Sequence, residues 1–158
     1  KDQVSFWGSK VSFLIVFVLL PIYMTGVMPY LLGFFILMFS TGIFISMVFQ
    51  LAHTVEDLSF PEPDAITNNM EDEWAIHQVK TTANFATKNK ILTWLFGGLN
   101  FQIEHHLFPK VSHVHYPALS KIVKKTAADF GITYNEFPRM YQAVWAHIIF
   151  LKRVGAAA

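Results

Sequence analysis

The first third of the chain is strongly apolar and contains a long segment without charge. No Lys, Arg, Asp or Glu occurs in the 45 residues from Val11 to Val55. As a single helix that segment would extend for about 68 Å, whereas a bilayer core needs only about 20 residues. The turn-forming residues Gly26 and Pro29 interrupt it near its middle. The pattern therefore predicts two membrane-spanning helices, at about 11–26 and 30–52, and the alternative is a buried hairpin in a soluble core.

Beyond this segment the apolar residues recur with helical spacing. A proline-containing acidic loop over 56–64 precedes a helix predicted at about 70–87. Pro117 suits the first turn of another helix, which Gly131 should end, and Pro138 begins a last helix with Gly155 beyond it. The pattern predicts an all-α fold, with a transmembrane hairpin over 11–55 and a helical cap over 56–158.

Composition supports membrane insertion and narrows the possible chemistry. Hydrophobic residues make up 53% of the 158 positions and charged residues 15%, against about 25% charged in soluble domains. The net charge of +1 argues against a nucleic-acid partner. Because the chain has no cysteine, it has neither a disulfide nor a thiolate metal site. A metal would have to be held by nitrogen and oxygen ligands.

The basic residues predict the orientation of the hairpin. Lys1 and Lys10 lie before or at the start of the first apolar segment, the other ten Lys and Arg lie at or beyond Lys80, and none lies near the turn at Pro29. By the positive-inside rule both ends of the hairpin face the cytoplasm. We therefore expect an integral membrane protein whose cap lies on the cytoplasmic side.

A cluster of polar residues in the cap could bind a metal. On a helix, Gln102, His105 and His106 are spaced so that all three share one face. Imidazole groups suit Fe, Zn, Cu or Ni. Two adjacent histidines also occur as ordinary surface or core residues, and that alternative stays open from these residues alone.

His53 ends the second apolar segment. Ionisable side chains near membrane depth are costly and tend to be functional. Glu56 follows one helical turn later and could orient the His53 ring by accepting its second N–H. The alternative is an interfacial histidine in ordinary contact with water. The other histidines, His77, His113, His115 and His147, are interpreted as structural or loop residues.

The string QIEHHLFP, from Gln102 to Pro109, with GGLNF before it, closely resembles the third histidine box of membrane fatty acid desaturases. The resemblance is closest to the branch in which Gln replaces the first His of that box, the front-end or linoleoyl-CoA-like desaturases. Three further segments also resemble sequences of this family: FQLAH around His53, TTANFATKN over 81–89 and HVHYP over 113–117. The resemblance covers about residues 11–154.

The resemblance implies a specific chemistry. Such enzymes hold two non-haem irons in a shell of histidines and use O2 with electrons from an external donor, of the cytochrome b5 or ferredoxin type. They remove two hydrogens from a fatty acyl-CoA or acyl-lipid chain and leave a cis double bond. Carried over by motif, His105 and His106 are iron ligands, Gln102 occupies the position of the first His, and His53 is an extra ligand. Asn100, Glu104 and Glu56 are expected to support these ligands, with no catalytic residue beyond the metal centre.

The chain departs from the family pattern because the first two histidine boxes, HDxxH and HxxHH, are absent. Three histidines and a glutamine cannot hold two irons in the family's manner. We therefore expect a single desaturase domain, 1–158, that is a C-terminal fragment and inactive by itself. The alternatives are a fatty acid hydroxylase with the same type of boxes and a catalytically inactive membrane fragment or binding module. The expected location is the bacterial inner membrane, or the endoplasmic reticulum in a eukaryote.

Overall fold

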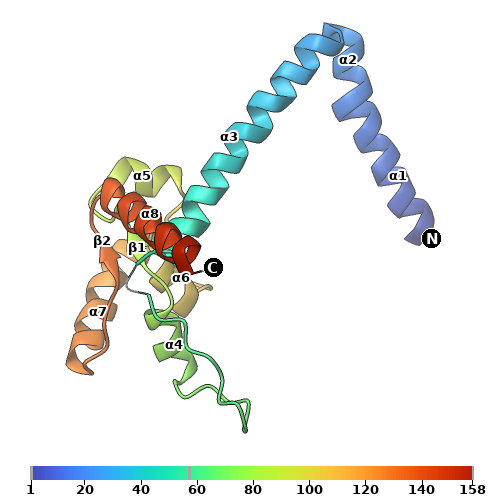
Figure 1. The fold of residues 1–158 in the computed structure, drawn as a ribbon. Helices are drawn as coiled ribbons and strands as arrows, with labels where there is room; N and C mark the ends of the chain where they lie inside the picture. Colours follow the sequence, from blue (N-terminus) through green and yellow to red (C-terminus); the bar gives the residue numbers. More distant parts are fainter. Residues whose placement is uncertain (1, 57, 158) are drawn as a thin grey trace. The chain divides into compact units, whose positions relative to one another are not determined.

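The computed structural model describes residues 2–56 and 58–157 (Figure 1). The chain divides into two compact units, Lys1–Ile45 and Ser46–Ala158. The boundary falls inside a helix, so that the last turns of this helix belong to the second unit. That division places His53 in the same unit as His105 and His106.

The first unit is a helical hairpin. Helix α1 (Asp2–Leu14), a wider π-helical turn (Ile15–Leu19) and α2 (Leu20–Thr25) follow one another, and α3 (Val27–His53) begins after Gly26. Gly26 has a φ of +87°, a backbone conformation that few residues other than glycine adopt. The predicted break is confirmed. Both arms, Asp2–Thr25 and Val27–His53, are long and apolar enough to cross a membrane, and the first begins earlier than predicted.

The second unit is built around the last turns of α3. Its short helices are α4 (Trp74–Lys80), α5 (Lys90–Leu95) and α6 (Gln102–Leu107). A 3₁₀ turn (His113–His115) leads into α7 (Tyr116–Asp129), and α8 (Met140–Ala157) follows. Strands β1 (Asn84–Phe85) and β2 (Glu136–Phe137) pair in parallel, with Asn84 opposite Glu136. The fold is mostly helical, as predicted, but the helical periodicity did not predict these two strands.

The core of this unit joins α3 to the strands and to α8. One cluster of buried apolar side chains draws on α3, on β1 and the residue after it, on the end of α5 and on α8; its members are Val48, Leu51, Ala52, Phe85, Ala86, Phe96 and Ala143. The backbone N–H of Ala83 also donates to the carbonyl of Ala52, at 2.9 Å. The segment before β1 is thereby tied to the end of α3.

Two predicted helix boundaries were wrong. The helix expected over 70–87 is only α4, because the chain beyond Lys80 turns to bond with Ala52 and to form β1. Helix α8 runs through Gly155 instead of ending before it. The other boundaries agree better. Helix α7 carries Pro117 in its first turn, and Gly131, with a φ of +69°, follows its end.

Candidate metal centre

A tight turn of two glycines sets the start of α6. Gly97 and Gly98 have φ values of +56° and +75°. A Cβ added to Gly98 would lie 2.7 Å from Cβ of His113, which is closer than side chains approach. The turn therefore requires glycine for its backbone conformation and, at Gly98, for the close approach of the segment that begins α7.

Asn100 anchors this turn to β1. Its side chain is fully buried and donates from Nδ2 to the carbonyl of Phe85 and to Oγ1 of Thr93, each at 3.1 Å. The backbone carbonyl of Asn100 accepts from the backbone N–H of Phe85 at 3.0 Å. Asn100 was predicted to support the histidines. These contacts place it in the frame that carries α6, so any support it gives is indirect.

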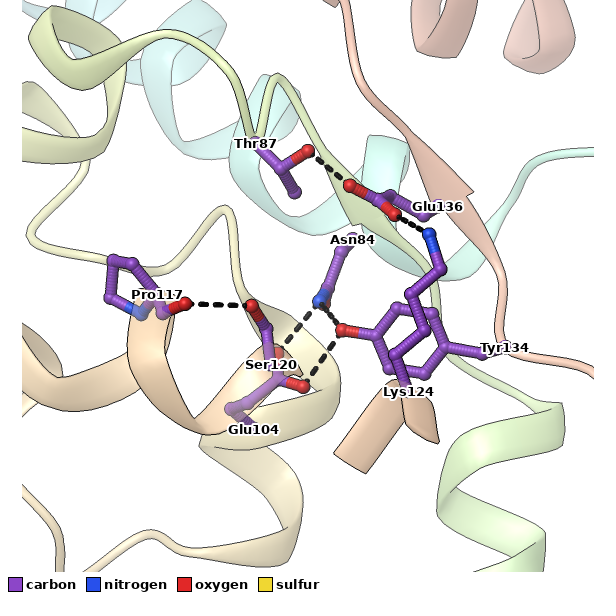
Figure 2. Close-up of polar contacts among 8 residues, drawn as sticks. All are labelled: Asn84, Thr87, Glu104, Pro117, Ser120, Lys124, Tyr134 and Glu136. Carbon is purple, nitrogen blue, oxygen red and sulfur yellow. Dashed lines mark hydrogen bonds and ion pairs between the residues drawn. The ribbon is translucent and has the colours of Figure 1, made fainter. Parts of the chain in front are cut away.

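Glu104 lies at the centre of a buried polar cluster (Figure 2). Its carboxylate accepts from Nδ2 of Asn84 at 2.7 Å and from the hydroxyl of Tyr134 at 2.8 Å. Nδ2 of Asn84 also donates to that hydroxyl at 2.6 Å, and Oδ1 of Asn84 accepts from the N–H of Ile103. Burial raises the pKa of Glu104 above its ordinary value, and the bonds from Asn84 and Tyr134 oppose that shift. The cluster holds one side of α6 against β1.

A second acidic residue, Glu136, also has hydrogen-bond partners in the region drawn in Figure 2. Glu136 of β2 accepts from Oγ1 of Thr87 and from Nζ of Lys124, each at 2.5 Å. Burial by itself would raise the pKa of Glu136. The hydrogen bonds from Lys124 and Thr87, together with the positive charges of Lys124 and Lys88, outweigh burial, and the pKa lies below its ordinary value. On α7, Oγ of Ser120 donates to the carbonyl of Pro117 at 3.1 Å.

The structure brings His53 close to the adjacent pair His105 and His106, which lies far from it in sequence. The rings of His53, at the end of α3, and His106, in α6, have centroids 5.1 Å apart and meet edge to face. The rings of His105 and His106 are 5.9 Å apart. Gln102, the fourth predicted ligand, is buried at the first position of α6, with 3% of its surface exposed.

Two residues that sequence reasoning missed contact these histidines. Oε1 of Gln78, in α4, lies 2.7 Å from Nδ1 of His106. The hydroxyl of Tyr116, at the start of α7, lies 3.2 Å from Nδ1 of His105. Tyr116 stands in the HVHYP string already singled out, but no pattern in the sequence distinguishes Gln78.

Glu56 does not have the contact expected of it. Its carboxylate pairs with the guanidinium of Arg153 in α8, and its N–H donates to the carbonyl of Ala146. The His53 ring lies beside the backbone of Thr81 instead. The opposite charge that reaches Glu56 in the fold comes from α8, 97 positions away in sequence. His147 has the structural role expected of it, since its Nδ1 lies 2.6 Å from the carbonyl of Thr54.

Comparison with known proteins settles the family. The profile of the family described as fatty acid desaturase matches residues 2–138. The chain belongs to the fatty acid desaturase family. It is 41% identical to an sn-1 linoleoyl-lipid 6-desaturase of Synechocystis over 128 residues, which is 81% of this chain and 36% of that protein. An acyl-lipid (8-3)-desaturase of Physcomitrium patens is 44% identical over 115 residues, 73% of this chain and 24% of that protein.

A more distant relative matches almost the whole chain. A probable Delta(5) fatty acid desaturase of Dictyostelium discoideum is 34% identical over 98% of this chain and 34% of its own length. The chain thus spans about a third, or less, of each of these relatives. No solved structure gives a significant match.

The side chains of this chain could provide some, but not all, of the ligands of a metal site. Among residues 2–56 and 58–157, no group of three or more His, Asp or Glu is close enough to hold a metal ion. Burial, helped by the neighbouring rings of His53 and His105, lowers the pKa of His106 and favours the neutral imidazole that binds metals. With Nδ1 of His105 and His106 each facing a partner, Nε2 of each ring is left for a ligand. These residues fit as contributors to a histidine-rich site that other groups would have to complete.

Proposed function

We propose that this chain is part of an O2-dependent enzyme that introduces a cis double bond into a fatty acyl chain at a non-haem diiron centre. The observation that carries the proposal is the meeting of His53 with His106, whose ring also lies against that of His105, in a chain of the desaturase family. The relatives named for acyl-lipid substrates favour an acyl lipid, with acyl-CoA as the alternative carrier.

In this proposal His53, His105 and His106 ligate iron, and Gln102 occupies the remaining position of the box. These four side chains are too few for two irons, so the other ligands come from outside these 158 residues. This agrees with the fraction of each relative that the chain spans. When bound, iron supplies the activation of O2 that removal of hydrogen from an unactivated C–H bond requires.

The chain's own residues hold the ligands in place. The glycine turn and the buried Asn84, Glu104 and Tyr134 cluster set the position of α6. Tyr116 and Gln78 engage the Nδ1 atoms, which orients the two rings. The apolar arms Asp2–Thr25 and Val27–His53 anchor the protein in a bilayer, and the basic residues beyond Lys80 favour the cytoplasmic side for the site.

The overall reaction needs a reductant that this chain does not provide. Two hydrogens leave adjacent carbons, and two further electrons and two protons complete the reduction of O2 to two waters. A cytochrome b5 or ferredoxin-type protein is the proposed source of these electrons.

The test is product analysis in the full-length protein. Expressed with an electron donor in a host that lacks the product, it should yield acyl chains that have lost two hydrogens and gained a cis double bond, detected by mass spectrometry. The variant His106→Ala should abolish this product, whereas His115→Ala, at an exposed histidine, should not. Products that gain one oxygen atom would identify a hydroxylase, and an unchanged lipid profile would indicate an inactive membrane module. Either result overturns the proposal.

A further inference from the structure

The contact between Gln78 and His106 determines which nitrogen of the ring carries the proton. Oε1 of Gln78 lies 2.7 Å from Nδ1 of His106. An amide oxygen accepts hydrogen bonds and cannot donate one, so the hydrogen between these atoms belongs to Nδ1. In a neutral imidazole the lone pair is then on Nε2, which is the atom that can bind a metal.

The corresponding contact of His105 has no such selectivity. A tyrosine hydroxyl can donate or accept, so Tyr116, at 3.2 Å, is compatible with a proton on either nitrogen of His105. Of the two histidines of α6, only His106 therefore has a neighbour that selects its tautomer.

The short segment that carries Gln78 reaches both of the histidines that meet. Gln78 contacts His106, and the backbone of Thr81, just beyond the end of α4, lies beside the ring of His53. The segment is itself held in place: Nζ of Lys80 pairs with the Asp72 carboxylate at 2.7 Å. The carbonyl of Lys80 also accepts from the N–H of Ser59 at 3.2 Å. One anchored segment thus lies against the rings contributed by α3 and by α6.

We propose that Gln78 is a positioning residue of the metal centre, which holds His106 in the tautomer that presents Nε2 to iron. This inference rests on the proposed function, because it assumes that His106 is a ligand. Gln78 does not touch the metal. It acts through the orientation and protonation pattern of the His106 ring.

The experiment measures Fe²⁺ affinity in the full-length protein purified in detergent, by equilibrium dialysis with metal analysis. Gln78→Met keeps the length of the side chain and removes the acceptor, so it should weaken iron binding roughly 10- to 100-fold. Gln78→Glu keeps an oxygen that only accepts, and should bind iron at least as tightly as the wild type. Gln142→Met, at an amide that caps the start of α8, is the matched control and should leave the affinity unchanged.

The result with Gln78→Glu separates positioning from a general structural role. If Gln78→Met and Gln78→Glu bind iron equally weakly, or if Gln78→Met binds like the wild type, the inference is wrong. His106→Ala tests the assumption beneath it. Iron binding that is unaffected by His106→Ala overturns the proposed function, and the inference with it. Loss of iron in His106→Ala with wild-type affinity in Gln78→Met overturns the inference alone.

Discussion

At the scale of single residues, the region behind the histidines is a polar cluster in which nearly every group has a partner. Asn84 donates to Glu104 and to Tyr134, and accepts from the backbone of α6. Glu104 is fully buried, so its carboxylate depends on these bonds. A buried polar group that loses its partner costs about 1–3 kcal/mol. The cluster therefore stabilises the position of α6 only while all of its members are present.

The first prediction concerns Tyr134. Tyr134→Phe removes the hydroxyl that donates to Glu104 and accepts from Asn84. It should lower the free energy of unfolding by about 1–3 kcal/mol, because a buried carboxylate loses a partner. Chemical denaturation in detergent, followed by the fluorescence of the tryptophans, measures the change.

Tyr141→Phe is the matched control, since that side chain is 62% exposed on α8. It should change stability by less than about 0.5 kcal/mol. Equal effects of the two substitutions would show that the hydroxyl of Tyr134 has no special importance.

At the scale of elements, a pair of two-residue strands connects segments of the second unit that are distant in sequence. The β1–β2 pair joins the segment after α4 to the segment before α8, and α6 lies against β1 through Asn84. Two-residue strands have little intrinsic stability, so side-chain contacts at their ends matter. Glu136, held by Thr87 and Lys124, provides such a contact.

This arrangement predicts a pH dependence of stability. The pKa of Glu136 is lower in the folded protein than its ordinary value of 4.5. A carboxylate of this kind contributes stability above pH 4.5, and the contribution is lost as the pH falls through the lower folded pKa. Glu136→Gln should therefore be less stable than the wild type near neutral pH, and the difference should shrink below pH 4.5.

Unfolding midpoints measured between neutral pH and pH 3 provide the comparison. Glu71→Gln, at an exposed glutamate in the loop before α4, is the control and should parallel the wild type. A stability difference for Glu136→Gln that is constant across this range would contradict the assignment.

At the scale of the whole molecule, the two units differ in what surrounds their apolar side chains. The hairpin arms expose large apolar residues along their length, such as Phe17 at 60% and Leu37 at 58%. In the second unit, apolar side chains from α3, β1 and α8 form buried clusters. So much exposed apolar surface on two long helices is expected where lipid replaces water.

Membrane insertion can be tested by substituting one charged residue into the hairpin. Leu37→Arg should hinder insertion of the hairpin, since an arginine near the middle of a spanning helix costs about 2.5–3.5 kcal/mol. The measurement is the fraction of protein that stays with membranes after alkaline carbonate extraction. Ile66→Arg, at a side chain 93% exposed in the second unit, should have no effect. A wild-type protein that carbonate releases completely would favour the alternative of a soluble apolar hairpin.

Local pattern was sufficient for much of this protein. The charge-free segment and its break at Gly26 located the two apolar arms, because hydrophobic runs and chain breakers act within a few residues of themselves. Gln102, His105 and His106, which have the spacing of one helix face, do lie on a helix, α6. The motif around them also pointed to the family that the comparisons established.

The tertiary structure decided which groups meet. His53 faces His106, Arg153 takes the carboxylate of Glu56, and Gln78 reaches Nδ1 of His106. Each contact joins residues at least 28 positions apart, and none has a periodic signature.

The chain beyond Lys80 leaves its helix for the same reason, because the N–H of Ala83 donates to the carbonyl of Ala52 of α3. The sequence by itself determined the apolar arms and most of the helices of the cap, and it supplied the candidate ligand types, since these depend on neighbouring residues. Packing decided the partners of each ligand, since those depend on segments that only the folded chain brings together.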